Sequence, residues 1–406
     1  MIIIIDLESF TFSHEEFNAG TIYQIAVAHP DKDIVYYAER EQIKYVTKLI
    51  KVKNVKNICF QKLSQLSKIR EEKDADIKNI YEDILNDIFI QNEKIDNIIF
   101  TSCAPEGLPV LYESIKKNQD IKFSLMLHGN IELLIKLNLM QINGLYKIGP
   151  IYLKSQLLDM FRQLKSVFDE KKYMKVWFIR KYLNILAEQD NVNFFVFSNE
   201  YLKYQDKIGL KLCQKFNKIY LPYIFNMEIK HEFDADKEVY IGIMPSTAAA
   251  KDAVVWKVVS YVNRHVNKVN RNFKFVLFRG WNRGLKNTIT YENTEKDRAN
   301  LERFFRSCDW ILLPYPKSKY ILSCSGVLFD SFNMEVPVIM YNSNSFNDFE
   351  KYNVGIRQYS IKELGEAIIE LINTHNKRDM MKYIENIHAM KDDIQKSNIE
   401  TFKDIF

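Results

Sequence analysis

The sequence predicts an α/β protein made of two doubly wound domains with parallel sheets. Short β-branched runs alternate with amphipathic stretches along the chain, which is typical of parallel α/β architecture. The alternation stops at a polar stretch, Lys230–Lys237, and then starts again. The length of 406 residues suits two or three domains, and 47% hydrophobic with 27% charged residues is the composition of a globular protein.

The elements of the first half follow from this alternation. Continuous apolar runs predict buried strands, and amphipathic stretches between them predict helices. The predicted strands are Ile2–Ile5, Ile34–Tyr37, Asn57–Phe60, Asn97–Phe100, Phe123–Leu127 and Asn193–Phe197. The predicted helices are Glu39–Ile50, Ile77–Gln91 and Leu108–Lys117.

The second half repeats the pattern. Its predicted strands are Val239–Ile243, Phe273–Phe278, Trp310–Leu313 and Val338–Met340. Its predicted helices are Ala253–Asn267, Asp297–Ser307, Gly326–Asn333 and Ile361–Thr374. We therefore expect an N-terminal domain over residues 1–230, a second domain over 231–378 and a helical segment over 379–406. Sheets of this kind bind ligands at the carboxyl ends of their strands, so two in tandem predict a cleft between the domains.

The net charge and the absence of targeting patterns indicate which partners and which location to expect. A net charge of +5 suits an anionic small molecule or an anionic membrane surface, and it is too small for a nucleic-acid-binding protein. No apolar run is long enough to span a bilayer, and the start lacks a signal-peptide pattern, so a cytoplasmic chain is expected. The five cysteines are scattered and predict neither a disulfide framework nor a zinc site.

One segment, Ile151–Lys181, interrupts the alternation. It holds eight Lys and Arg residues against three Asp and Glu residues, with apolar side chains on one helical face. A basic amphipathic helix of this kind can lie on anionic lipid. The alternative is an ordinary surface helix that packs its apolar face on the domain.

The stretch Trp310–Ile339 carries the most chemical information. A strand ends at a proline-containing loop, and Ser325-Gly326-Val327 then begins a helix that carries Asp330. Small residues at a helix start leave backbone N–H groups directed at an anion, and the helix dipole adds to the attraction. Asp330 can accept hydrogen bonds from a vicinal diol such as ribose. The alternative is a capped helix with an acidic residue near its start.

This second half resembles the donor domain of GT-B glycosyltransferases, in particular the large retaining group of bacterial polysaccharide and lipopolysaccharide enzymes. FDSFNMEVPVI matches the end of the group's motif, with Asp330 at its second Glu. The first Glu position falls on Leu322, and the preceding strand ends LLPYP, which places Tyr315 at the donor. The resemblance implies that Tyr315, Ser325, Gly326, Val327 and Asp330 bind a nucleotide-diphosphate sugar.

The resemblance extends to the first strand of this domain. IGIMPSTAAAKD keeps the group's Lys as Lys251 but has Ser246 in place of its Arg. Lys251 is implied to clamp the pyrophosphate, and Ser246 to offer a hydrogen bond. Arg279, at the end of FKFVLFRGWN, is a candidate for the missing cation.

In the N-terminal half the resemblance implies an acceptor-side domain. FSHEEFNAG, Phe12–Gly20, stands where such enzymes have a loop facing the cleft, with Gly20 near the donor phosphates and Glu16 near the acceptor. His128 ends a predicted strand on the same side and can hydrogen-bond a sugar or diphosphate. The resemblance also implies that the last helix, Asp379–Ile405, crosses back to the N-terminal domain.

These features together predict a glycosyltransferase of bacterial surface polysaccharide synthesis, retaining and metal-independent, that transfers a sugar to a glycan or lipid-linked acceptor. Lys251, Arg279, His128 and Glu16 are its catalytic candidates. The Asp-x-Asp pairs at Asp74 and Asp234 match a metal motif in letters but fall in charged, non-strand segments. A non-catalytic GT-B-like partner protein and a nucleotide-sugar epimerase or hydrolase remain alternatives.

Overall fold

The computed structural model describes residues 1–9, 14–66, 76–127, 170–204, 209–210, 215–225, 238–244, 249–278, 285–291, 298–315, 320, 322 and 324–406, with the backbone alone for 170–175, 202 and 249–253. These residues divide into two compact units. The first contains the described residues up to 224 together with 394–406, and the second contains 225–393. The boundary expected at residues 230–231 lies outside the described residues.

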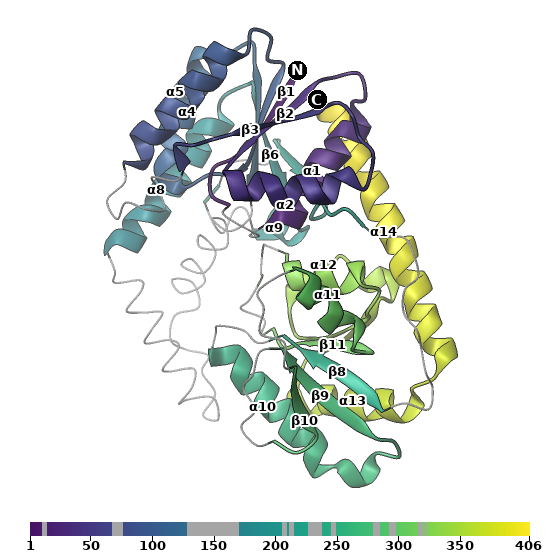
Figure 1. Ribbon diagram of the computed structural model, residues 1–406. Coiled ribbons are helices and arrows are strands. Elements are labelled where there is room, and N and C mark those ends of the chain that lie inside the picture. Colours follow the sequence, from purple (N-terminus) through teal and green to yellow (C-terminus); the bar gives the residue numbers. More distant parts are fainter. Residues whose placement is uncertain are drawn as a thin grey trace. The chain divides into compact units, whose positions relative to one another are not determined.

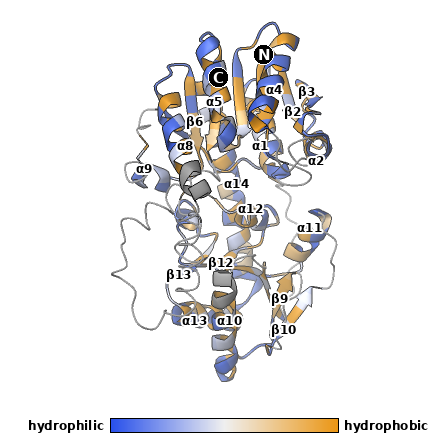
Figure 2. Ribbon diagram, turned by 90° about the vertical axis from the view of Figure 1, so that its left-hand side faces the viewer, coloured by the Kyte–Doolittle hydropathy of each residue, from blue (hydrophilic) through white to orange (hydrophobic). Residues whose placement is uncertain are grey.

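The first unit is built on a parallel sheet of seven strands in the order β3-β2-β1-β4-β5-β6-β7 (Figure 1). The strands are β1 Ile2–Asp6, β2 Ile34–Ala38, β3 Ile58–Lys62, β4 Asn97–Ser102, β5 Lys122–Leu127, β6 Val192–Val196 and β7 Phe216–Lys218. Ile2–Ile5 are fully buried because β1 lies in the middle of the sheet, with helices on both faces. Figure 2 shows that the central strands are hydrophobic, whereas the surrounding helices also carry hydrophilic residues.

Helices cover both faces of this sheet. The α-helices are α1 Glu15–Ala28, α2 Arg40–Lys51, α4 Ile77–Gln91, α5 Leu108–Lys117, α8 Glu170–Ala187 and α9 Glu200–Tyr204, and a 3-10 helix, Pro105–Gly107, precedes α5. Helices α1 and α2 pack together, and α5 packs against α4 and α8 on the opposite face (Figure 1). Acidic N-cap side chains stabilise the starts of α2 and α4. The Glu39 carboxylate accepts from the amides of Glu41 and Gln42 at the start of α2, and the Asp76 carboxylate accepts from the amides of Lys78 and Asn79 at the start of α4.

The second unit is built on a parallel sheet of six strands in the order β10-β9-β8-β11-β12-β13. The strands are β8 Val239–Ile243, β9 Phe273–Phe278, β10 Thr288–Tyr291, β11 Trp310–Leu313, β12 Val338–Tyr341 and β13 Gly355–Gln358. The α-helices are α10 Ala249–Arg264, α11 Arg298–Arg306, α12 Gly326–Asn333, α13 Ile361–Thr374 and α14 Lys377–Ile405, and short 3-10 helices lie at Val266–Lys268, Asn344–Phe346 and Glu350–Tyr352. Helix α10 packs against α13 over one face of the sheet, and α11 and α12 lie over the other (Figure 1).

The last helix returns to the first unit, as expected. Residues 394–406 at the end of α14 belong to that unit. There the Asn398 side chain accepts from the Tyr220 amide at 2.8 Å and donates to the Gln24 side chain at 3.0 Å. Asn398 is fully buried, so these bonds satisfy polar atoms that have no access to water.

Two expectations for the first half are wrong. Residues 15–20 were expected in a loop, but they form the first turns of α1. Helix α1 is buried on nearly all sides, so it lacks the amphipathic period that identifies surface helices. The strand expected at Asn57–Phe60 exists as β3, but it is an exposed edge strand and not a buried one, with Cys59 and Lys62 at the surface.

Candidate functional site

Each sheet has one point at which the strand order reverses, and several of the described candidate residues lie there. In the first unit the chain runs outward from β1 through β2 and β3 and then returns to β4 on the other side of β1. In the second unit it runs outward from β8 and returns to β11. In open α/β sheets, ligands bind outside the carboxyl ends of the strands at such switch points. A ligand is therefore expected near the loops after β1, β4, β8 and β11.

After β11, the chain forms a small polar centre at the start of α12. The Tyr315 hydroxyl and the Ser325 hydroxyl are 2.9 Å apart, and both side chains are buried. Burial raises the pKa of Tyr315, so the phenol stays protonated and acts as a hydrogen-bonding group. Ser325 is the N-cap residue but its side chain does not cap the helix, because it faces Tyr315.

The start of α12 lies partly at the surface of the second unit. Gly326 is exposed and Val327 is half-buried, so the backbone at the start of this helix lies at the surface. The helix dipole places partial positive charge at this end of α12, which favours an anion there. The predicted residues Tyr315, Ser325 and Gly326 are thus brought together at the switch point.

Asp330 lies one turn further along α12 and is paired with a residue that the sequence did not suggest. The Arg298 guanidinium Nη1 is 2.7 Å from the Asp330 carboxylate, and its Nε is 3.3 Å from Glu302. Both partners of the Asp330 pair are mostly buried, at 10% and 17% side-chain exposure. Arg298 begins α11, so this ion pair joins α11 to α12. Asp330 is therefore held in one orientation before any ligand binds.

Of the remaining candidates, the structure describes Leu322 and the backbone of Lys251. Leu322, at the position of the group's first Glu, is a buried apolar side chain at 4% exposure. Lys251 lies in the first turn of α10, directly after the β8 loop at the switch point. Ser246, Arg279 and His128 lie outside the described residues.

The corresponding point of the first unit is organised around Asp6, which the sequence analysis did not single out. Asp6 ends β1 and is fully buried. Its carboxylate accepts from the amides of Glu8 and Ser9 at 3.1 and 2.9 Å, and from the side chains of Asn18 and Ser102. A shift in the β1–β4 register places Asp6 beside Ser102. With this many donors the carboxylate fixes the loop after β1 to the start of α1 and the end of β4.

Two further polar residues lie at the start of α1. His14 is the N-cap residue, with a left-handed backbone (φ 60°), and its Nδ1 is 3.5 Å from the Ser9 hydroxyl. Burial lowers the pKa of His14, and the nearby Asp6 carboxylate opposes that shift. Glu16 lies in the first turn and is buried, where the helix dipole favours a negative charge. These two residues are positioned beside the switch point of the first sheet.

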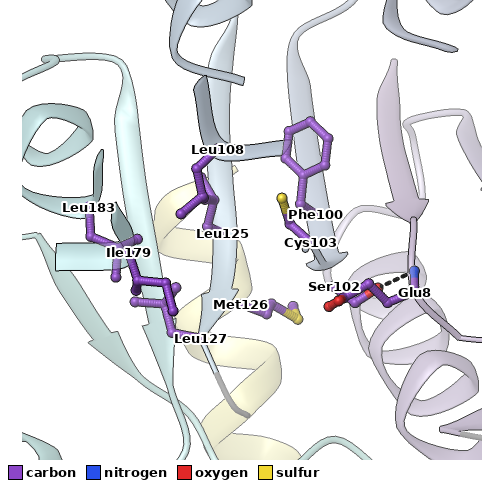
Figure 3. Close-up of a pocket in the computed structure, with 10 residues that line it drawn as sticks. All are labelled: Glu8, Phe100, Ser102, Cys103, Leu108, Leu125, Met126, Leu127, Ile179 and Leu183. Carbon is purple, nitrogen blue, oxygen red and sulfur yellow. Dashed lines mark hydrogen bonds between the residues drawn. The ribbon is translucent and has the colours of Figure 1, made fainter. Parts of the chain in front are cut away.

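A cavity of about 60 Å³ opens beside the ends of β4 and β5 (Figure 3). Its lining is mostly apolar and includes Leu108, Met126 and Ile179. Glu8 and Ser102 lie at one side, where the Glu8 amide donates to the Ser102 hydroxyl at 3.0 Å. Burial raises the pKa of the Cys103 thiol, which therefore stays neutral and lines the cavity as an apolar group.

Gly20 lies in the middle of α1, away from a helix end. A Cβ atom at this position would lie 2.5 Å from the carbonyl carbon of Pro222 and from the amide nitrogen of Tyr223. Only glycine allows the 222–223 backbone to approach the helix this closely. Close packing within the first unit explains this glycine, and its expected contact with the donor gains no support.

The sequence carries a signal for one of the two residues that were missed. Asp6 is a charged residue directly after four isoleucines, so it must end a central strand with its carboxylate near the sheet. Arg298 has no comparable signal, because its partner Asp330 is 32 positions away. Among the described residues, no group of three or more His, Cys, Asp or Glu side chains is arranged to hold a metal ion. None of the helices in the described part has the length and apolarity needed to cross a membrane.

Comparison with solved structures identifies the fold. A glycosyltransferase from Rickettsia africae aligns with 100% of this chain and 98% of its own, at 14% identity and a TM-score of 0.58. HepE from Anabaena, in complex with UDP-glucose, aligns over 99% and 98% of the two chains, at 11% identity and a TM-score of 0.57. A UDP-forming α,α-trehalose-phosphate synthase from Burkholderia xenovorans aligns over 100% and 98%, at 7% identity and a TM-score of 0.55.

These matches define the class of fold. Two parallel α/β units, of seven and six strands, with full-length alignment to glycosyltransferase structures, are the GT-B fold predicted from the sequence. No family model and no curated protein matches the chain. At these identities the likeness concerns the fold alone, and a fold of this kind does not specify a reaction.

Proposed function

We propose that this protein is a glycosyltransferase that takes a sugar from a nucleoside-diphosphate sugar bound at the start of α12. The observation that carries the proposal is the switch point of the second sheet. There the start of α12 with its exposed Gly326, the Tyr315–Ser325 hydroxyl pair and the fixed carboxylate of Asp330 lie after the carboxyl end of β11. This arrangement can bind both polar parts of a nucleoside diphosphate. Backbone amides at the helix start can donate hydrogen bonds to the phosphates, and the carboxylate can accept hydrogen bonds from the ribose diol.

The reaction requires stabilisation of negative charge on the departing diphosphate. Backbone amides and a cation supply this without a metal ion when they are fixed in advance. Gly326 and Val327 provide the amides in this proposal, and Lys251 and Arg279 provide the cations. Ser246 adds a hydrogen bond. We propose that the sugar is transferred with retention of configuration at its anomeric carbon. The departing phosphate takes the proton of the acceptor hydroxyl.

The acceptor belongs to the first unit in this proposal. Glu16 and His128 are the candidates to contact it, and the fixed loop after β1 gives the acceptor a preorganised surface. We propose a glycan or lipid-linked glycan of bacterial surface polysaccharide as the acceptor, met at the cytoplasmic face of the membrane. The segment Ile151–Lys181 is the sequence-based candidate for that membrane contact, and most of it lies outside the described residues.

One observation favours a second candidate function. Leu322 places a buried apolar side chain where the related group has an acid that reads the donor sugar. A protein that keeps the nucleotide site but has lost sugar recognition would act as a non-catalytic partner of an active enzyme. A nucleotide-sugar hydrolase or epimerase would instead act on the donor without an acceptor.

Two measurements separate these functions. A thermal-shift screen with the diphosphates of uridine, guanosine, cytidine and adenosine identifies the base, because a ligand that binds only the native state raises the melting temperature. Uridine is the first choice, since HepE was solved with UDP-glucose. The matching nucleotide sugars are then assayed for release of the diphosphate with and without acceptor glycans. Acceptor-dependent release supports the transferase, release without an acceptor supports the hydrolase, and binding without release supports the non-catalytic partner.

A further inference from the structure

A surface groove on the second unit is lined by residues of α10, of the turn before β10 and of the start of α13. Figure 1 labels these elements. It has a volume of about 770 Å³. Trp256, Leu285 and Ile361 form its apolar part. No part of the proposed glycosyl transfer uses these residues, so the groove needs its own explanation.

The charged side chains known to line this groove are basic. Lys257, Arg264 and Lys286 line it, and no Asp or Glu is among the described residues of its lining. On the neighbouring α13, the Glu366 carboxylate accepts from the Tyr261 hydroxyl at 3.2 Å and does not line the groove. Three cations beside an apolar surface fit a ligand that is anionic at one end and apolar at the other.

The groove is also fixed in shape. The Asn263 side chain of α10 donates to the Lys286 carbonyl at 2.7 Å and accepts from the Asn287 side chain at 3.0 Å. These bonds hold the turn that carries Leu285 and Lys286 against the helix. Ile361 packs on the hydrophobic core of the unit. The apolar and basic parts therefore keep their positions relative to each other.

Trp256 indicates which anionic partner the groove takes. Trp256 is 46% exposed on the solvent-facing side of α10, whereas Val255 and Val258 are buried on its other side. Exposed tryptophan next to lysine and arginine is typical of surfaces that rest on a membrane, where the ring lies at the headgroup level. Nucleic acid would require a longer basic track, and the net charge of the whole chain is only +5.

We propose that this groove binds anionic phospholipid and rests the second unit on a membrane surface. Trp256, Leu285 and Ile361 contact the outer part of the acyl chains, while Lys257, Arg264 and Lys286 contact the phosphates. This inference goes beyond the proposed function and does not depend on it. It also concerns a different surface from the segment Ile151–Lys181.

Vesicle binding by the full-length protein tests the groove. Co-sedimentation is measured with phosphatidylcholine vesicles that contain phosphatidylglycerol as one third of the lipid, and with pure phosphatidylcholine. We expect binding to the anionic vesicles alone, weakened by salt. The double variant Lys257→Glu with Lys286→Glu should bind at least about 25-fold more weakly, since each cation near the surface contributes about fivefold.

A matched control separates the groove from net charge. Lys116→Glu with Lys117→Glu changes the net charge equally on exposed residues of α5 in the first unit, and should weaken binding by less than about threefold. Both pairs are exposed, so both variants should keep the wild-type melting temperature. Equal loss in the two double variants would overturn the proposal, as would absence of wild-type binding or binding to RNA in place of vesicles.

Tryptophan emission locates the contact directly. Trp177 on α8 is exposed to a similar extent, at 50%, and falls in the other candidate segment. Vesicles should shift the wild-type emission to shorter wavelength, because the Trp256 ring leaves water. Trp256→Phe should lose this shift and Trp177→Phe should keep it. The reverse result would place the membrane contact on the first unit and overturn the proposal. Nucleotide binding by the same variants reports separately on the proposed function.

Discussion

Replacing Glu335 by alanine should destabilise the second unit by about 3–5 kcal/mol, because it leaves a buried lysine without its counter-ion. The Glu335 carboxylate is 2% exposed and lies 2.7 Å from His388 Nε2 and 3.6 Å from Lys391 Nζ. The Lys391 side chain is fully buried. Both partners are on α14, so Glu335 holds the last helix against the turn between α12 and β12.

The backbone of Glu335 provides an internal control for this prediction. Its φ is 63°, in the left-handed region where a side chain costs about 1–2 kcal/mol relative to glycine. Glu335→Gly also removes the carboxylate but relieves this strain. It should therefore be more stable than Glu335→Ala by about 1–2 kcal/mol. Adding Lys391→Met to Glu335→Ala should restore most of the stability, because no buried charge is left unpaired.

The same cluster predicts a pH dependence of stability. Burial lowers the pKa of Lys391 from 10.5 to about 8, and Glu335 partly opposes the shift. Between these two values the unfolded state binds more protons than the folded state, so the free energy of unfolding rises with pH. Relative to Lys391→Met, the wild-type protein should gain about 2.4 kcal/mol as the pH rises from about 7.5 to 10.

Urea denaturation followed by circular dichroism measures these differences. The two units can unfold separately, so the transition that shifts in Lys391→Met identifies the second unit. A loss below about 1 kcal/mol for Glu335→Ala, the value of an exposed ion pair, would refute the reasoning from burial. Equal stability of the alanine and glycine variants would refute the argument from backbone strain.

Three further substitutions test the site and the packing. Asp330→Ala should weaken nucleotide binding in calorimetry by about 1.5–3 kcal/mol, provided that circular dichroism shows a folded protein; unchanged affinity would remove Asp330 from the donor site. Lys251→Ala should lower kcat more than donor affinity, because its charge interacts most strongly with the fully developed leaving phosphate; a change in affinity alone would contradict this role. Gly20→Ala should destabilise the first unit by about 1–3 kcal/mol in urea, because a Cβ atom overlaps the Pro222 backbone; wild-type stability would contradict that contact.

The fold could be predicted because the buried strands are recognisable in the sequence as continuous apolar runs. Ile2–Ile5 and Trp310–Leu313 are continuous apolar runs, and both form central strands as expected. The elements that were missed lack such a pattern. Helix α1 is buried all round, and β13, Gly355–Gln358, is a half-buried strand at the edge of its sheet.

The candidate site was predictable only where its parts are close together in sequence. Tyr315, Ser325 and Gly326 were expected at one place because a single strand-loop-helix stretch contains them. The Arg298–Asp330 pair and the Asp6–Ser102 bond join residues 32 and 96 positions apart. Such contacts depend on which strands become neighbours, and a hydrophobic pattern does not specify that order.

The central claim is that a nucleoside diphosphate binds at the start of α12, and a crystal structure with the diphosphate chosen by the thermal-shift screen tests it most directly. We predict phosphate oxygens within about 3 Å of the Gly326 and Val327 amides, and a ribose hydroxyl within hydrogen-bond distance of the Asp330 carboxylate. A nucleotide bound away from the carboxyl ends of β8 and β11, or none at saturating concentration, would contradict the claim.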